Sequence, residues 1–406
     1  MIRLEVLDGY PWSGLLLLAT QAAMLMMLVV RLLPGRTRPR PVRPSGAPPR
    51  NTTVTVVVTT LNEVTRLQPC LNGLMAQTEP LLEVLVVDSR STDGTRDLVH
   101  AAARRDSRVR LITDAPLPEG WVGKVWALET GLRQARGDWV LGIDADTEPA
   151  PGLVGAVVAA AEEGGFDVAS FSPRFTAQSI GERFVQPAML VTLVYRCGAP
   201  GATTPPHDRV LANGQCFLAR RALLVEHGGY ASARASFSDD VTLARHLAAR
   251  GARVGFLDGS EIIRVRSYVS LRQMWREWGR SFDLKDATPP LRRWIDLLLV
   301  WSTQALPLPL LIILATIVTA RAPELSVTPY YRLAYALLLV NAIAFVVRLL
   351  LLVALRGSYA KRGLPFWCSW LADIPAAVRL TMSTVSSPDS WRGRTYHTLS
   401  RVTPGP

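Results

Sequence analysis

The sequence predicts an α/β domain with a mostly parallel central sheet, flanked by N-terminal and C-terminal transmembrane helices. Between residue 51 and about residue 266, short β-branched runs alternate with helical stretches, an order typical of a parallel sheet covered by helices on both faces. Apolar blocks at residues 12–30, 295–320 and 333–355 lie outside this region. Each block is long enough to cross a bilayer core of about 30 Å.

Positive charge gathers beside the apolar blocks. The net charge is +12, and arginines follow the first block in a Pro-rich linker, at Arg31, Arg36, Arg38, Arg40, Arg43 and Arg50. This position favours contact with anionic lipid, and no nucleic-acid-binding motif accompanies the charge, so we expect no nucleic-acid partner. The four cysteines, Cys70, Cys197, Cys216 and Cys368, are far apart, which indicates a reducing compartment and no zinc site.

The charges also predict the topology. The first block is long and is followed by arginines, which favours an uncleaved anchor over a signal peptide. With the linker on the cytoplasmic side, the middle domain is cytoplasmic, and the protein is a multi-pass protein of the inner or plasma membrane. The segment 364–385 contains Asp373, Pro375 and Arg379, so we expect it to be interfacial or re-entrant.

These patterns divide the chain into five parts. They are an N-terminal anchor (1–33), a Pro/Arg-rich linker (34–50), a cytoplasmic α/β domain (51–262), an interfacial amphipathic helix (263–291) and a C-terminal membrane region (292–406). The last part holds two spans, the segment 364–385 and a cytoplasmic tail. Within the spans, Asn341 and Arg348 are the polar residues that stand out, and Arg348 is close enough to the cytoplasmic end to snorkel.

The elements of the middle domain follow in order. Residues 53–60, 83–88, 109–113 and 139–144 are predicted strands, and residues 67–77, 95–105 and 125–135 are predicted helices. In parallel sheets, ligands bind outside the carboxyl ends of the strands. The loops at that edge carry Glu63, Asp88, Asp93, Lys124, Asp144 and Asp146.

Asp144 and Asp146 leave one strand with no lysine or arginine beside them in the sequence. Two carboxylates at this spacing can turn toward one point, where they suit a hard divalent cation such as Mg²⁺ or Mn²⁺. A cation shared with a diphosphate would neutralise both. The alternative is that Asp146 or Thr147 only caps the next helix, and the pattern alone does not decide between the two.

Asp239 and Asp240 begin an amphipathic helix. Because adjacent carboxylates repel, we expect one to have a raised pKa and the other to be held by its neighbours. Helix capping and the helix dipole would also explain an acidic start.

A further helix is predicted around residues 268–282. Tyr268, Leu271, Trp275, Trp278 and Phe282 form an apolar stripe, with Arg272, Arg276 and Arg280 to one side. A basic amphipathic helix with tryptophans is typical of the membrane interface. The alternative is that the helix packs against the sheet.

The motifs TTLNE, VVDSRSTDGT, GIDADTEP and FSDD occur in the order found in family 2 glycosyltransferases of GT-A fold, which the chain resembles. PEGWVGKVWAL, PFWCSWLADIPA and WRGRTY resemble the branch that glycosylates carotenoids, hopanoid-related lipids and ceramide. The resemblance covers almost the whole chain. It implies a GT-A domain, a nucleotide diphosphate sugar as donor, a lipid acceptor and a divalent metal.

The resemblance also implies roles for single residues. Asp88 would contact the nucleobase, and Thr60, Leu61 and Glu63 would line the nucleoside pocket. Lys124 would lie near the diphosphate, Asp144 near ribose or metal, and Asp146 on the metal. Alternatively, Lys124 is a solvated lysine before a helix and Asp88 belongs to a capping turn. Asp240 would be the general base, supported by Asp239.

The family motif Q-x-x-R-W is altered here. Gln273 and Arg276 keep its first part, but one residue separates Arg276 from Trp278. We therefore expect Arg276, or else Arg280, to contact the diphosphate, with Trp275 and Trp278 bordering the acceptor.

The resulting hypothesis is an inverting hexosyltransferase. Its donor is a nucleotide sugar such as UDP-glucose, and its acceptor is a membrane lipid, for which a carotenoid is the first choice. Hopanoid-related, sterol and ceramide-type lipids are the alternative acceptors. A nucleotidyltransferase of the same fold, or a non-catalytic membrane scaffold or transporter subunit, would be a different class of protein.

Overall fold

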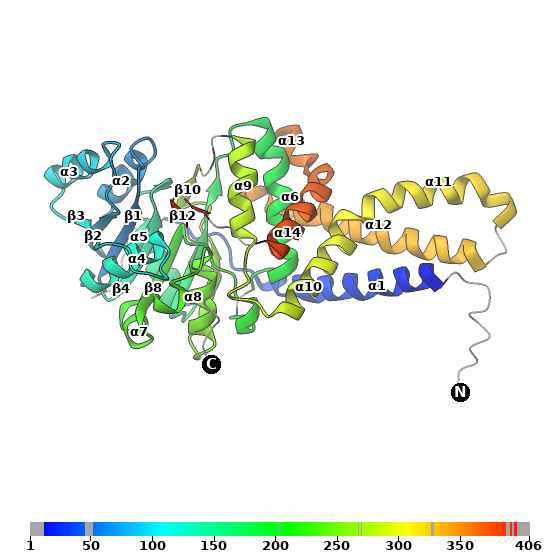
Figure 1. Ribbon diagram of the computed structural model, residues 1–406, viewed down its shortest axis with the longest axis horizontal. Coiled ribbons are helices and arrows are strands. Elements are labelled where there is room, and N and C mark those ends of the chain that lie inside the picture. Colours follow the sequence, from blue (N-terminus) through cyan, green and yellow to red (C-terminus); the bar gives the residue numbers. More distant parts are fainter. Residues whose placement is uncertain are drawn as a thin grey trace.

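A computed structural model of the chain describes residues 12–44, 52–201, 203–266, 268, 270–325, 329–386, 390–391 and 394–395. An α/β domain forms one end, and helices that extend away from it form the other (Figure 1). We call α1, α6 and α9 to α14 the helical bundle.

The central sheet has seven strands in the order β3-β2-β1-β4-β8-β6-β9. Their bounds are β1 Val54–Thr60, β2 Leu81–Asp88, β3 Val109–Thr113, β4 Trp139–Asp144, β6 Val168–Ser172, β8 Cys216–Arg220 and β9 Val254–Asp258. All neighbours are parallel except β8, which runs antiparallel to β4 and β6. The four predicted strands are confirmed within two residues at each end.

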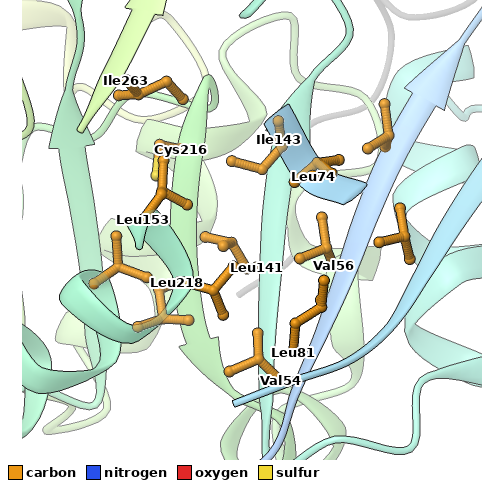
Figure 2. Packing of buried hydrophobic residues seen from close by; sticks show 14 of the residues in the cluster. Val54, Val56, Leu74, Leu81, Leu141, Ile143, Leu153, Cys216, Leu218 and Ile263 are labelled. Carbon is orange, nitrogen blue, oxygen red and sulfur yellow. The ribbon is translucent and has the colours of Figure 1, made fainter. Parts of the chain in front are cut away.

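Helices cover both faces of the sheet, as the sequence predicts. One face packs against α2 (Leu67–Met75), α3 (Thr95–Arg105) and α5 (Leu153–Glu163), and the other against α4 (Gly123–Gln134), α7 (Arg221–Glu226) and α8 (Asp239–Ala248). Figure 2 shows Val56 and Leu141 of neighbouring strands on the same face, beside Leu74. Strands buried on both faces need the continuous β-branched runs seen in β1.

The strand register places the carboxyl ends of β1, β2 and β4 at one edge. Thr60 pairs with Asp88, and Thr59 pairs with Asp144. A second, three-stranded sheet adjoins this edge, with β10 (Ile263–Val265) between β5 (Thr147–Pro149) and β7 (Arg174–Phe175). β10 begins directly after residue 262, where the sequence predicted the end of the α/β domain, so the strands of this domain extend to residue 265.

The bundle contains helices that are apolar enough to cross a membrane. Among the described residues, α1 (Trp12–Leu32) with the turn after it and α12 (Pro329–Leu355) with the turn after it pass by length and composition. α10 (Pro290–Val300), a π-helical turn (Trp301–Ala305) and α11 (Pro307–Leu325) form a pair bent by 50°. The predicted second span is therefore a broken helix, and Pro307 follows the break.

The remaining bundle helices are α6 (Ile180–Cys197), α9 (Leu271–Ser281), α13 (Gly363–Trp367) and α14 (Asp373–Val385), and a short hairpin joins β11 (Ser390–Trp391) to β12 (Arg394–Thr395). Single turns lie at Leu33–Thr37, His207–Arg209, Gly229–Ala233, Arg356–Ser358 and Ser369–Ala372. Half of the WRGRTY motif, residues 392, 393 and 396, and the end of the C-terminal tail lie outside the described residues.

Among the polar side chains inside the bundle, Arg348 pairs with Asp373 and Asn341 pairs with Gln21. Arg348 is 1 % exposed and binds both oxygens of Asp373, so the prediction that it snorkels is wrong. The reason is that α13 and α14 fold back beside α12 and bring a carboxylate to it. Asn341 exchanges hydrogen bonds with Gln21 of α1 at 2.9 and 3.0 Å.

Candidate active site

A cavity of about 960 Å³ lies between the carboxyl edge of the central sheet and the helical bundle. Twelve of the fourteen predicted site residues line it, namely Thr60, Leu61, Glu63, Lys124, Asp144, Asp146, Asp239, Asp240, Gln273, Arg276, Trp278 and Arg280. Asp88 and Trp275 do not. Residues more than 200 positions apart in the sequence therefore meet at one site.

Asp144 and Asp146 have basic neighbours in space that the sequence does not reveal. Lys124 Nζ, at the start of α4, lies 2.8 Å from Asp144 Oδ1. Arg66 lies 3.9 Å from Asp146 Oδ2 and 2.6 Å from Glu63. Although no basic residue stands beside the two aspartates in the sequence, basic residues from other loops reach both of them in the fold.

Asp240 is held at the start of α8. Its Oδ2 accepts a hydrogen bond from the Gly214 N–H at 2.6 Å, and its Oδ1 accepts one from the Val241 N–H at 2.8 Å. Burial and the charge of Asp239 raise the pKa of Asp240 to about 7, although Lys124 and the two N–H groups act in the opposite direction. A carboxyl with this pKa exchanges a proton near neutral pH.

Asp239 has a raised pKa as well. Burial is the main cause and Asp144 adds to it, while Lys124 opposes the shift. The expected raised pKa is therefore found at both carboxyls of the pair, because both are buried close to further negative charge. Ser238 takes the N-cap position, so neither aspartate is the cap of α8.

Lys124 is surrounded by negative charge. Burial alone would lower its pKa, but Asp144, Asp239 and Asp240 together raise it above the ordinary value. Lys124 is therefore a fixed cation within a group of carboxylates. The backbone of Gly214 approaches closely here, since a Cβ at this position would lie 3.1 Å from Lys124 Nζ.

The helix α9 forms the opposite wall of the cavity. Arg280 forms an ion pair with Glu277 at 2.9 Å, whereas Arg276 is exposed and has no ion pair among the described residues. The buried positions are Met274, Trp278 and Phe282, and Leu271 is 42 % exposed. Four of the five residues of the predicted apolar stripe, Tyr268, Trp275, Trp278 and Phe282, pack in the core of the bundle, because α9 packs against α6 and α14 rather than against the sheet.

Asp88 is fully buried. Its carboxylate accepts hydrogen bonds from Thr60 Oγ1 at 3.1 Å, Ser91 Oγ at 2.5 Å and the Ser91 N–H at 3.0 Å. In this conformation it closes a turn, and the predicted contact with a nucleobase would require the loop to move. Trp275 is placed beside the cavity wall, with its carbonyl bound to Arg379.

Sequence reasoning missed several residues that line the cavity. They are Arg38, Arg66, Asn213, Gly214, Gln215, Arg379 and Ser383. No local pattern marks them, because they come from loops and from α14 and meet the site only through the fold.

The metal expectation depends on Asp144 and Asp146. The described residues contain no group of three or more His, Cys, Asp or Glu side chains that could hold a metal ion. The two carboxylates are the hard oxygen donors that Mg²⁺ and Mn²⁺ prefer, and both line the cavity. They fit a metal whose other ligands come from a bound diphosphate.

The fold is GT-A-like. The structure of a mannosyltransferase from Pyrobaculum calidifontis, solved with GDP-Man and Mn²⁺, aligns over 92 % of this chain and 98 % of that chain, with a TM-score of 0.53 and 21 % identity. Identity at this level shows the shared fold and no more.

Residues 55–228 match the family model of Glycosyl transferase family 2. The probable glycosyltransferase YdaM of Bacillus subtilis (strain 168) is 23 % identical over 56 % of this chain and 53 % of its own length. A GalNAc(5)-diNAcBac-PP-undecaprenol beta-1,3-glucosyltransferase of Campylobacter jejuni is 28 % identical over 27 % of this chain and 35 % of its own. The chain thus spans about half the length, or less, of these relatives.

Proposed function

We propose that the protein is an inverting glycosyltransferase that moves a hexose from a nucleotide diphosphate sugar to a hydroxyl of a membrane lipid. One observation carries the proposal. A single cavity joins the cluster of Lys124, Asp144, Asp239 and Asp240 to apolar side chains of the helical bundle. Its volume is at the upper end of the range of about 300–1,000 Å³ for small-molecule sites, enough for a donor and the reacting end of an acceptor.

The donor occupies the edge of the sheet in this proposal. Thr60, Leu61 and Glu63 line its nucleoside part, and Lys124 compensates negative charge near the diphosphate. Asp146 and Asp144 hold Mg²⁺ or Mn²⁺, which when bound stabilises the departing diphosphate. The Mn²⁺ and GDP-Man in the Pyrobaculum mannosyltransferase structure support a divalent metal and a nucleotide sugar.

Asp240 is the proposed base. Its carboxylate takes the proton of the acceptor hydroxyl as that oxygen bonds to the anomeric carbon, while the bond from this carbon to the diphosphate breaks. A pKa of about 7 suits this task, because the group is both deprotonated and basic near neutral pH. Asp239 supports it by raising that pKa.

The acceptor occupies the bundle side. Leu190, Leu193 and Val194 of α6, together with Leu355 at the end of α12, line this part of the cavity. An uncharged alcohol with an apolar body fits such a wall and needs a base, which favours a carotenoid-type alcohol, with hopanoid-related, sterol and ceramide-type lipids as alternatives. The undecaprenol-linked acceptor named for the Campylobacter relative supports a lipid in general.

On the opposite wall, Arg276 is the proposed contact of the diphosphate. It is exposed on the cavity and has no ion pair among the described residues, whereas Arg280 is engaged with Glu277. Gln273 lines the same wall, and Trp278 borders the acceptor. The catalytic domain faces the cytoplasm, on the side of the arginines that follow α1.

The test is transfer by membranes that contain the full chain. Labelled UDP-glucose and GDP-mannose are offered with a carotenoid alcohol, a hopanoid alcohol, a sterol or a ceramide, with and without EDTA. We expect label in one lipid product and its loss with EDTA. Label in a product with a nucleotidyl group would support a nucleotidyltransferase instead. Absence of both product and nucleotide-sugar binding would support a scaffold.

A further inference from the structure

The helices α9 and α14 are joined by an arginine that binds backbone rather than a carboxylate. Arg379 Nε donates a hydrogen bond to the Trp275 carbonyl oxygen at 2.8 Å, and Arg379 Nη2 donates one to the Arg276 carbonyl oxygen at 3.4 Å. The guanidinium carbon also lies 6.0 Å from the centre of the Trp275 ring. Arg379 thus holds the backbone of the residue whose side chain faces the diphosphate in the proposed function.

The ends of the two helices cap each other. Ser383 Oγ, near the end of α14, donates to the Gly279 carbonyl oxygen near the end of α9 at 2.8 Å. Lys285, in the loop after α9, donates to the carbonyl oxygens of Ser383 and Ser386 at 2.7 and 2.6 Å. The last carbonyls of a helix have no partner within it, and cations are favourable there. The contacts therefore fix both helix ends.

α14 is itself anchored to the rest of the bundle. Its first residue, Asp373, binds Arg348 of α12 and accepts a hydrogen bond from Gln304 of the π-helical turn at 3.0 Å. Further along, Thr381 Oγ1 accepts a hydrogen bond from Trp301 Nε1 at 3.0 Å. A continuous set of contacts thus leads from the membrane helices through α14 to α9.

Gly279 of α9 allows the guanidinium of Arg379 to lie directly against the helix. A Cβ at residue 279 would overlap the guanidinium of Arg379. Alanine favours helices over glycine, so a methyl group at an unconstrained helical position would stabilise α9. Here it would push Arg379 away from the carbonyls that it binds.

We infer that α14 positions the wall of the cavity that α9 forms, with Arg379 and Ser383 holding α9 so that Arg276 faces the donor. The inference rests on the proposed function, because it concerns the same site. Arg379 and Ser383 act through α9, so they are positioning residues rather than catalytic ones.

The first experiment compares Arg379→Met and Arg379→Lys with Arg362→Met, an exposed cation beside α13, in the full chain in nanodiscs. We expect Arg379→Met to raise the donor KM about tenfold, or about 1.4 kcal/mol, with a smaller change in kcat. Arg379→Lys restores part of the loss, and Arg362→Met resembles the native chain. An equal donor KM for all four proteins overturns the inference.

The second experiment uses Gly279→Ala, alone and together with Arg379→Met. If Arg379 positions α9, the alanine raises the donor KM in the native chain and changes little in the Arg379→Met chain, since the displaced group is already gone. Additive effects of the two substitutions contradict the inference. A loss of folded protein without a change in donor KM would show a purely structural role, and also overturns it.

UDP and GDP binding to each purified variant, measured by calorimetry, separates the two proposals. If the native chain binds neither nucleotide and transfers no sugar, both the proposed function and this inference are contradicted. If the native chain is active and Arg379→Met binds nucleotide as tightly as Arg362→Met, only the inference about α14 fails.

Discussion

Two regions of the molecule bury carboxylates beside one cation, with opposite outcomes. In the bundle, Arg348 and Asp373 match charge for charge, and Gln304 fills a further position on the carboxylate. At the cavity, Lys124 faces Asp144, Asp239 and Asp240, so negative charge is in excess. The bundle pair is closed on itself, whereas the cavity cluster lines an open volume.

The difference shows that a balanced ion pair has a structural role, whereas a cluster with excess negative charge is suited to catalysis. A buried pair with every charge matched gains little net stability, but it fixes which helices meet, because removing one partner leaves an unpaired charge. A cluster with excess carboxylates keeps at least one acid with a raised pKa, here Asp240. Such a cluster is suited to bind cations and exchange protons.

The largest effect is expected when the cavity cluster loses its base. Asp240→Asn should lower the transfer rate about 10²- to 10⁴-fold, the range typical of a general base, because no carboxylate then takes the acceptor proton. The donor KM should change little. Initial rates with labelled donor measure this, and Glu226→Gln, an exposed acid on α7, is the matched control. A turnover equal to that of the control would remove Asp240 from its role.

The bundle pair should respond in stability rather than chemistry. Arg348→Met leaves Asp373 as an unpaired buried charge and should reduce the free energy of unfolding by about 3–5 kcal/mol. The double variant Arg348→Met/Asp373→Leu should recover most of this loss. Unfolding followed by tryptophan fluorescence in detergent measures both. A single variant as stable as the native chain would show that the pair does not hold α14.

The same comparison marks what the sequence could predict. The edge residues Asp144 and Asp146, and Asp239 and Asp240 at the start of α8, follow from strand ends and a helix start, which are local patterns. The partners Lys124 to Asp144 and Arg66 to Asp146 are contacts between separate loops, so no spacing reveals them. The fold class was predictable because it follows from local patterns of strands and helices, whereas these ion pairs depend on contacts between distant parts of the chain.

The membrane region was less predictable in detail. Hydropathy predicts where apolar helices lie, and α1 and α12 agree with it. It does not predict that Arg348 turns inward, because the partner Asp373 lies on a segment that folds back beside α12. The apolar stripe of α9 does not show by itself whether it faces lipid or protein, and in the structure it packs against α6 and α14.

The pH dependence of kcat/KM tests whether the negative charge of Asp239 raises the pKa of Asp240. The base acts when deprotonated, so kcat/KM should rise with pH through about 7, the pKa of Asp240. Asp239→Asn removes a neighbouring negative charge, lowers the pKa of Asp240 and should move this rise about one unit toward acid. Rate profiles from pH 5 to 9 measure the shift. A shift toward alkaline pH, or no shift, would mean that Asp239 does not set the pKa of the base.

The contribution of Asp240 to folding stability should fall as the pH rises, whereas kcat/KM should rise. The pKa of Asp240 is about 7 in the folded protein and about 4 in an unfolded chain, so the folded state binds the proton more tightly. The contribution of Asp240 to stability is therefore present below about pH 4 and is lost as the pH rises to about 7. In Asp240→Asn this part of the pH dependence should disappear from unfolding curves.

The smallest effects are expected on α9, where the two arginines differ in their ion pairing and in their exposure. Arg276→Gln should raise the donor KM about tenfold, and Arg280→Gln about twofold, because a partly exposed ion pair such as that of Arg280 and Glu277 contributes little by itself. Adding Glu277→Gln to Arg276→Gln should recover part of the affinity, since Arg280 then loses its ion pair one turn along the same wall. If Arg280→Gln has the larger effect, the ion pair opens on donor binding and Arg280 is the contact of the diphosphate.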